Sequence, residues 1–130
     1  MYEKRLIELA LKAREKAYCP YSNFAVGAAL LCQDGTIYTG CNIESSAYTP
    51  TICAERTAVS KAVSEGHRDF VRIVIAGRSE DFCVPCGVCR QVLREFAPEL
   101  EIICLNGAGE ERVFTLPELL PHSFGPEYLL

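Results

Sequence analysis

The sequence predicts an α/β fold, a three-layer α/β/α sandwich around a five-stranded mixed sheet. Segments with strand character alternate with segments of helical periodicity, an order typical of a sheet covered by helices. A length of 130 residues with 49% apolar content suits one domain, residues 1–130. About five residues link the last two strands, too few for a parallel crossover. These strands should therefore form an antiparallel hairpin.

The first quarter of the chain is predicted to form a helix followed by a hairpin. Apolar residues recur at spacings of three and four over 3–17, which indicates an amphipathic helix. The nearly unbroken apolar run at 25–32 favours a strand covered on both faces. The Asp-Gly pair within 33–35 accepts the positive φ of a hairpin turn. Residues 36–42 should then return as the second strand.

The middle of the chain is predicted to place a loop and a helix before the next strand. Residues 43–50 form a polar loop, a natural place for substrate contacts. Alanine and valine recur at helical spacing over 51–65, and Gly66 ends that helix. The apolar run at 70–77 should be a central strand, parallel to the strand at 25–32.

The last third should contain a helix, a hairpin and a short final helix. Residues 86–96 are predicted to be helical, followed by strands at 100–105 and 111–114 around a glycine-rich turn. Thr115 and Glu118 have the spacing of a capping box, which predicts a further helix start.

Composition restricts the possible partners. The formal net charge is -4 and the pI is about 5.2, which argues against a long nucleic-acid track. The charged N-terminal stretch does not resemble a signal peptide, and no apolar run approaches the ~20 residues of a membrane span. We therefore expect a cytoplasmic, reducing location, where grouped cysteines more often hold metal than form disulfides.

Two segments carry the strongest chemical signal. Cys53 and Glu55 stand two residues apart, and Cys86 and Cys89 form a C-x-x-C pair. Three thiolates suit a tetrahedral zinc ion with one position open for water, and a carboxylate can move protons to and from that water. Helical residues two apart diverge by about 200°, so Cys53 must lie at the very end of its helix if Glu55 is to share the site.

A zinc ion with three thiolates leaves one net negative charge, which weakens the metal as a Lewis acid. A positive or donating group nearby should offset this charge. Arg56 is the candidate donor to a ligand sulfur, and Gln91 is a second.

Other interpretations of the cysteines remain open at this point. Cys83, Cys86 and Cys89 resemble the start of an iron–sulfur motif, although Leu93 stands where the next cysteine belongs. A closed structural zinc site would use Cys83 or Cys41 as its fourth ligand. Most of the remaining cysteines are expected to be small buried apolar groups: Cys19, Cys32, Cys41 and Cys104. Neither His67 nor His122 has a partner at ligand spacing.

The chain resembles the small homotetrameric cytidine deaminases, within the cytidine/deoxycytidylate deaminase family, over roughly residues 5–124. In that family a zinc-bound hydroxide, with one Zn²⁺ per subunit, attacks C4 of the pyrimidine and ammonia leaves. The resemblance assigns Glu55 as the proton shuttle. The similar motifs, in order, are FAVGAAL at 24–30, GCNIE at 40–44, CAERTA at 53–58, PCGVCRQ at 85–91 and LLP at 119–121.

The same resemblance implies substrate contacts. Asn42 and Glu44 would bind the ribose hydroxyls, and Phe24 would pack on the pyrimidine. Tyr48 would line the pocket at a subunit contact, and Phe124 would reach the active site of a neighbouring subunit in a homotetramer. The chain departs from the family in the Ser-Ser pair after Glu44 and in five cysteines outside the zinc motifs.

The sequence therefore predicts a zinc enzyme of pyrimidine salvage that deaminates free cytidine and 2′-deoxycytidine. A deaminase of a related nucleoside such as blasticidin S is one alternative, disfavoured by the Asn42 and Glu44 pair. A non-catalytic module held by structural zinc is another. Deaminases that edit nucleic acids have a helix where this chain has its short last hairpin, and the acidic charge also argues against them.

Overall fold

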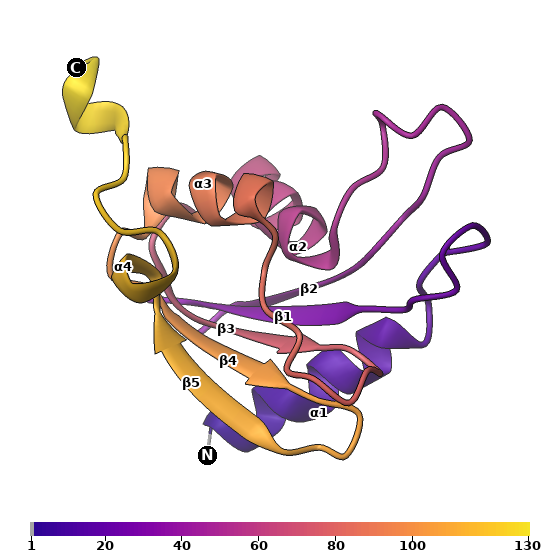
Figure 1. Cartoon of the computed structure of the whole chain (residues 1–130). Helices are drawn as coiled ribbons and strands as arrows, with labels where there is room; N and C mark the ends of the chain where they lie inside the picture. Colours follow the sequence, from indigo (N-terminus) through magenta and orange to yellow (C-terminus); the bar gives the residue numbers. More distant parts are fainter. Residues whose placement is uncertain (1) are drawn as a thin grey trace.

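The computed structural model describes residues 2–130. Five strands alternate with helices along the chain (Figure 1). The elements are α1 (Tyr2–Arg14), β1 (Gly27–Cys32), β2 (Ile37–Cys41), α2 (Ala54–Ser64), β3 (Phe70–Ala76), α3 (Gly87–Phe96), β4 (Glu101–Leu105), β5 (Glu111–Thr115), α4 (Leu116–Leu119) and a 3₁₀ turn (Pro126–Tyr128).

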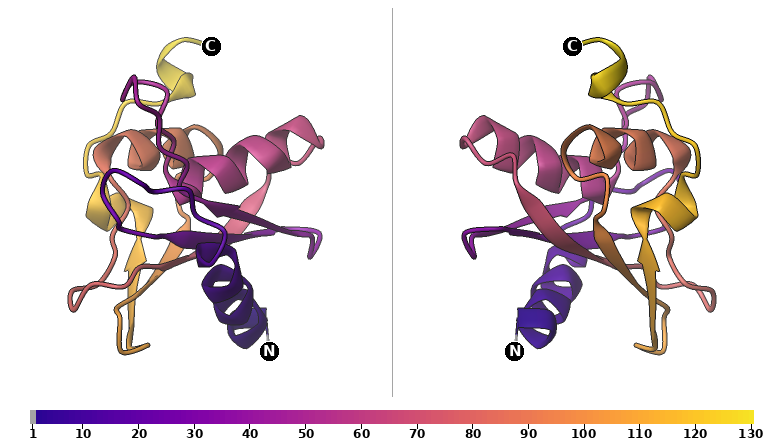
Figure 2. Two further views of the ribbon diagram at one scale, coloured as in Figure 1. Left: turned by 90° about the vertical axis from the view of Figure 1, so that its right-hand side faces the viewer. Right: turned by 90° about the vertical axis from the view of Figure 1, so that its left-hand side faces the viewer.

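The sheet has the strand order β2-β1-β3-β4-β5 and divides the molecule into three layers. Helix α1 covers one face, and α2 and α3 cover the other (Figures 1 and 2). Two apolar clusters fill these interfaces, one around Leu6 of α1 and one around Leu93 of α3. The three-layer α/β/α sandwich is confirmed, and every residue of β1 is buried, as its unbroken apolar run predicted.

The predicted direction of the third strand is wrong. β3 is central, but it pairs with β1 antiparallel. Its crossover helix α2 follows β2 and carries the chain back to the end of the sheet where β2 began, so β3 runs parallel to β2. The β1–β2 hairpin has already reversed the chain, so β3 runs opposite to β1. The apolar runs showed which strands are central but carried no information about direction.

Both hairpins form as predicted. Gly35, in the turn between β1 and β2, has a φ of 93°. β4 and β5 pair antiparallel from Glu101 opposite Thr115 to Leu105 opposite Glu111. At the end of β5, the amide of Thr115 donates to Glu118 Oε1 at 2.8 Å, as the capping-box spacing predicted. Within residues 2–130, no helix is both long and apolar enough to span a bilayer.

The beginning of α2 lies against β2 because Gly40 has no side chain. A Cβ added there would lie 2.4 Å from the carbonyl oxygen of Ala54 and 2.6 Å from the amide nitrogen of Ala58. Neither contact is possible for real atoms, and both partners are backbone that cannot rotate away. Gly40 therefore fixes the first turn of α2, where Cys53 and Glu55 lie, close to the sheet.

Candidate active site and metal centre

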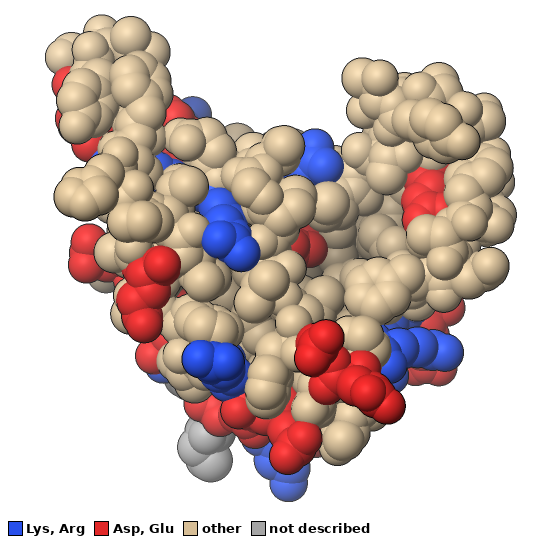
Figure 3. Space-filling model, in the orientation of Figure 1, with Lys and Arg blue, Asp and Glu red and all other residues tan. Residues whose placement is uncertain are grey.

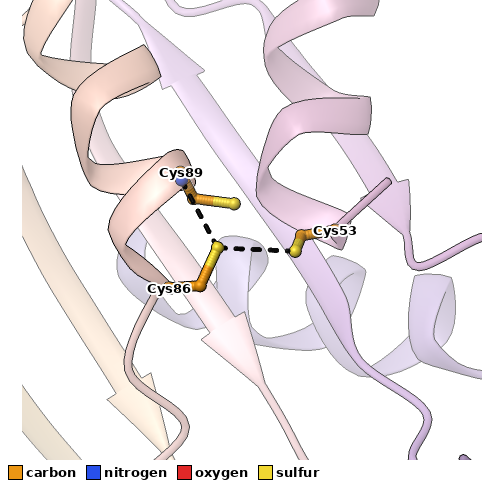
Figure 4. A group of neighbouring side chains, drawn as sticks. All are labelled: Cys53, Cys86 and Cys89. Carbon is orange, nitrogen blue, oxygen red and sulfur yellow. Dashed lines mark hydrogen bonds between the residues drawn. The ribbon is translucent and has the colours of Figure 1, made fainter. Parts of the chain in front are cut away.

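Three thiols from two distant segments meet above the centre of the sheet. The sulfur atoms of Cys53, Cys86 and Cys89 lie within 4.8 Å of one another, and those of Cys53 and Cys86 are 3.7 Å apart (Figure 4). A tetrahedral site with Zn–S bonds of about 2.3 Å has sulfur–sulfur edges of about 3.8 Å. The number, type and spacing of these donors therefore fit a zinc ion.

The beginnings of α2 and α3 present these thiols. Cys53 and Cys86 are the N-caps of the two helices, with extended backbone at ψ 157° and 168°. The sulfur of Cys86 accepts a hydrogen bond from the amide of Cys89 at 3.4 Å. Both helices direct the positive ends of their dipoles at the cluster, which favours thiolates over thiols. Helix α2 begins at residue 54 and not at 51, and this shorter helix lets Cys53 and Glu55 face the same region.

The cluster favours one ionised thiol even without metal. A hydrogen bond from Cys89, together with the Arg56 guanidinium, lowers the pKa of Cys53 to about 5. Arg56 Nη2 donates to the sulfur of Cys53 at 3.5 Å. Because the two sulfurs share a proton, the pKa of Cys89 is raised. Arg56 thus lies where its charge can offset the negative charge of a thiolate set.

Glu55 is the one acidic residue in the buried part of the site. Its side chain is 4% exposed and lines the same cavity as Cys53 and Cys86. Burial raises the pKa of Glu55 to about 7, and the charge of Cys53 adds to this effect. A carboxyl group with a pKa near the working pH exchanges protons efficiently in both directions.

The group of three thiols has no fourth protein ligand within the described residues. Cys41 and Cys83, the candidates for a closed site, are not among the grouped donors. Cys83 lines the adjacent cavity, where burial raises the pKa of its thiol to about 12 and keeps it neutral. The iron–sulfur interpretation, which needed Cys83 with Cys86 and Cys89, does not match this grouping.

A cavity of about 280 Å³ lies beside the thiols. Residues from several loops and from the start of α2 form its wall. Its lining includes Ser22, Phe24, Val26, Asn42, Glu44, Thr51, Cys53, Glu55, Cys83 and Cys86. A partly apolar cavity with a few converging polar groups is the usual form of a small-molecule site.

Asn42 connects the polar and the aromatic sides of this cavity. Its side-chain oxygen accepts from the amide of Val26 at 2.9 Å, and its Nδ2 donates to the carbonyl of Phe24 at 2.8 Å. One N–H and one lone pair of the side-chain amide remain for a ligand. Asn42 therefore holds the segment that carries Phe24, a role that the sequence did not reveal.

Glu44 marks the entrance, where a second hollow of about 410 Å³ begins. Its Oε1 accepts from the amides of Tyr21 at 3.0 Å and Ser22 at 3.1 Å, and its Oε2 accepts from the Ser22 hydroxyl. These bonds lower the pKa of Glu44, chiefly through the hydroxyl. A carboxylate offers about four acceptor sites, so one remains for a ligand. Tyr48, 76% exposed and with φ at 64°, lines the outer hollow.

Four predicted site residues line neither hollow: Cys89 and Arg56, which belong to the thiol group, and Gln91 and Phe124, which do not. Gln91 forms no hydrogen bond to a sulfur, and its Nε2 instead donates to the carbonyl of Phe124 at 2.9 Å. Phe124 is 55% exposed and stacks on Tyr128, with ring centroids 5.1 Å apart. Figure 3 shows the C-terminal segment rising on one side of a hollowed surface, across from the loop before α2.

The sequence did not predict some residues of the site and predicted a different role for others. Ser22 and Thr51 line the cavity, and nothing in their surroundings signalled it. The spacing of Cys83 to Cys86 suggested a metal ligand, whereas in the structure Cys83 lines the cavity. Of the cysteines predicted to be buried, Cys32 and Cys104 are, whereas Cys19 and Cys41 are half-buried.

Comparisons with known proteins agree over nearly the full length. A family model described as "Cytidine and deoxycytidylate deaminase zinc-binding region" matches residues 1–105. The cytidine deaminase of Sporosarcina psychrophila is 50% identical over 127 residues, 97% of this chain and 93% of that protein. That of Halalkalibacterium halodurans is 47% identical over 128 residues, 98% and 97% of the two chains. A crystal structure of cytidine deaminase from Burkholderia pseudomallei, 46% identical, has a TM-score of 0.92 and covers 95% of this chain and 100% of its own.

Proposed function

Because this chain belongs to the cytidine and deoxycytidylate deaminase family, we propose that it hydrolyses free cytidine and 2′-deoxycytidine to uridine and 2′-deoxyuridine, releasing ammonia, as in pyrimidine salvage. The observation that carries this proposal is the position of Glu55. It is a buried carboxyl group that lines one cavity together with thiols of a three-cysteine group able to bind zinc. A structural zinc site would have no need to bury an acid beside it.

Cys53, Cys86 and Cys89 would hold the metal. Zinc bound to three thiolates, with its fourth position open, supplies an activated water for attack on C4 of the pyrimidine. Glu55 would take one proton from that water and deliver it to N3, and it would then pass the second proton, from the hydroxyl left on C4, to the departing amine. Its raised pKa of about 7 suits both halves of this transfer. Arg56 offsets the negative charge of the thiolates through Cys53.

The remaining polar groups of the cavity would orient the nucleoside. The base would lie in the inner cavity against Phe24, and the ribose would extend toward Glu44. Asn42 and Glu44 each keep hydrogen-bonding capacity free for the sugar hydroxyls, beyond their bonds to the loop at 21–26. The Asn42 and Glu44 pair favours cytidine and 2′-deoxycytidine over a nucleoside antibiotic such as blasticidin S.

We further propose a homotetramer whose active sites are completed by neighbouring subunits. Tyr48 and Phe124 are largely exposed aromatics, and Phe124 does not line the cavity of its own chain. Exposed aromatic side chains of this kind are typical of surfaces that become covered on association. Tyr48 would line the pocket at a subunit contact, and Phe124 would close the site of a neighbour.

The proposed partner is a free nucleoside and not a polynucleotide. The net charge of -4 provides little attraction for a phosphate backbone. All eight cysteines are free thiols in the structure, and the three in the group must stay reduced to bind metal. A reducing compartment such as the cytoplasm meets that need.

The direct test is to add cytidine to the purified protein and follow the ultraviolet change on conversion to uridine. Turnover should be lost with a strong chelator and restored by added zinc. Glu55→Gln is the matched control, because it keeps the ligand set and removes the proton shuttle. Unchanged turnover in that variant would refute the mechanism, and no turnover by the zinc-loaded wild type would refute the function.

A further inference from the structure

The outward side of α3 binds the C-terminal arm, residues 121–130. Arg94 donates through Nε to the Ser123 hydroxyl at 2.7 Å and pairs through Nη2 with Glu127. One turn earlier, Gln91 donates to the carbonyl of Phe124. These contacts bracket Phe124 on both sides along the chain.

The Arg94 side chain is enclosed by the arm and not merely placed beside it. It is 13% exposed, whereas its partner Glu127 is 55% exposed. A Cβ added at Gly125 would lie 2.3 Å from Arg94 Nη1, so the arm passes over the guanidinium with no space to spare. A surface ion pair contributes little, but a guanidinium with two partners in fixed directions sets the geometry of what it holds.

The segment held in this way presents an aromatic surface. Phe124 and Tyr128 stack with an angle of 16° between their rings, and both are more than half exposed. The arm projects away from the body of the molecule (Figure 1). Few apolar contacts therefore fix its direction, and the polar contacts from α3 must do so.

The same helix also presents two of the three thiols. Cys86 caps its first turn and Cys89 lies within it, whereas Gln91 and Arg94 lie one and two turns further along. Gln91 and Arg94 together form the clamp on the arm. The helix is a rigid element that links this clamp to the metal-binding end. Its length fixes the position of Phe124 relative to the thiols of its own chain.

We propose that Arg94 is a positioning residue that holds the C-terminal arm so that Phe124 is presented to the active site of a second copy of this chain. The inference rests on the proposed function and adds to it a residue that touches neither metal nor substrate. Arg94 acts through Phe124 and on a neighbour's reaction, not on its own.

A double-mutant cycle tests this role. Arg94→Lys keeps the charge but cannot reach Ser123 and Glu127 in the same directions. We expect a fall of about tenfold or more in kcat/KM for cytidine, since small misplacements of a group at an active site cost up to about a hundredfold. In a Phe124→Ala background the same change should have almost no further effect. Arg5→Lys, on the exposed side of α1, is the matched control and should behave as the wild type.

Mixed oligomers show whether the effect crosses between subunits. A Glu55→Gln copy has a disabled site but an intact arm, and an Arg94→Lys copy has an intact site but a misplaced arm. After joint refolding, sites of the second copy that receive an arm from the first should regain wild-type kcat/KM. If Arg94→Lys acted by distorting α3 and its thiols, no activity would return.

The proposal fails if Arg94→Lys retains wild-type kcat/KM, if its loss adds fully to that of Phe124→Ala, or if mixing restores nothing. Should Arg94→Lys not fold, Glu127→Gln weakens the clamp from the arm side and leaves α3 intact, with the same expectations. Zinc content measured on every variant excludes loss of metal as the cause. An inactive wild-type enzyme would instead refute the proposed function, so the two failures are distinguishable.

Discussion

The thiol group and the C-terminal arm both depend on α3, but the molecule holds them by different means. Cys53 and Cys86 are fixed by backbone, as N-caps of two helices packed on a buried sheet. The arm is fixed by side chains, chiefly Arg94 and Gln91, and its aromatic residues face solvent. The thiols of the first region come from one chain, whereas Phe124 in the second lies outside the cavity of its own chain. Under the proposed function, one subunit would supply the chemistry and the homotetramer would enclose it.

This contrast predicts how steeply variants should lose activity. Changes among the thiols and Glu55 should abolish turnover with little effect on assembly. The loop at 21–26 by the cavity entrance is also held by side chains, those of Asn42 and Glu44, so changes there should cost less and should affect substrate binding and loop stability together.

The largest effect is expected from Glu55→Gln. The variant keeps the size of the side chain but cannot carry protons, and proton transfer contributes about 10²–10⁴-fold to rates. We expect kcat for cytidine to fall by at least two orders of magnitude while zinc content and melting temperature stay near wild type. Retained turnover at full zinc occupancy would show that Glu55 is not the proton shuttle.

Asn42→Ala should affect both activity and stability, because Asn42 binds the backbone at Val26 and Phe24. Leaving those buried groups unpaired costs about 1–3 kcal/mol in the free energy of unfolding. kcat/KM should fall as well, through lost ribose contact and displacement of Phe24. Denaturant unfolding and steady-state kinetics measure the two effects.

Glu44→Gln is the matched comparison at the entrance. It retains an acceptor oxygen for the amides of Tyr21 and Ser22, so its unfolding free energy should change much less than that of Asn42→Ala. Its KM for cytidine should nevertheless rise. Equal destabilisation by both variants would contradict the assignment of Asn42 as the anchor of the Phe24 segment.

Arg56→Gln should have an intermediate effect confined to the metal. Arg56 helps to lower the pKa of Cys53 to about 5, so its removal raises that pKa and lets protons compete with zinc at higher pH. Zinc affinity in a chelator competition should fall by about 10–100-fold. The midpoint of acid-induced zinc release should move upward in pH. Unchanged turnover, zinc affinity and pH profile would remove Arg56 from the site.

The smallest effect is expected from Glu118→Ala, whose side chain hydrogen-bonds to Thr115 and to neither the thiols nor the arm. Its Oε1 accepts bonds from the amide and the hydroxyl of Thr115 at the start of α4. Losing exposed bonds of this kind should lower the free energy of unfolding by about 0.5–1.5 kcal/mol, measured by denaturant titration. Turnover per folded enzyme should not change, and a marked loss of kcat would mean that α4 also supports the site.

Predictions from local pattern succeeded where the physical cause is local. The apolar run of β1 predicted burial, Asp34-Gly35 predicted a turn, and Thr115 with Glu118 predicted a helix start. The requirement that Cys53 end its helix also followed from the helical repeat alone, and the structure has Cys53 as the N-cap of α2. The direction of β3 was predicted wrongly, because strand direction depends on which strand the crossover joins.

By itself, the sequence determined which elements form, which strands are buried, and which thiols and carboxyl group can do zinc chemistry, because periodicity, turn chemistry and ligand type are properties of neighbouring residues. Only the tertiary structure decided that Cys53 meets Cys86 and Cys89 and not Cys83, that Asn42 holds the Phe24 segment, and that Gln91 serves the arm. These are contacts between residues far apart along the chain, and they are selected by how helices pack on the sheet.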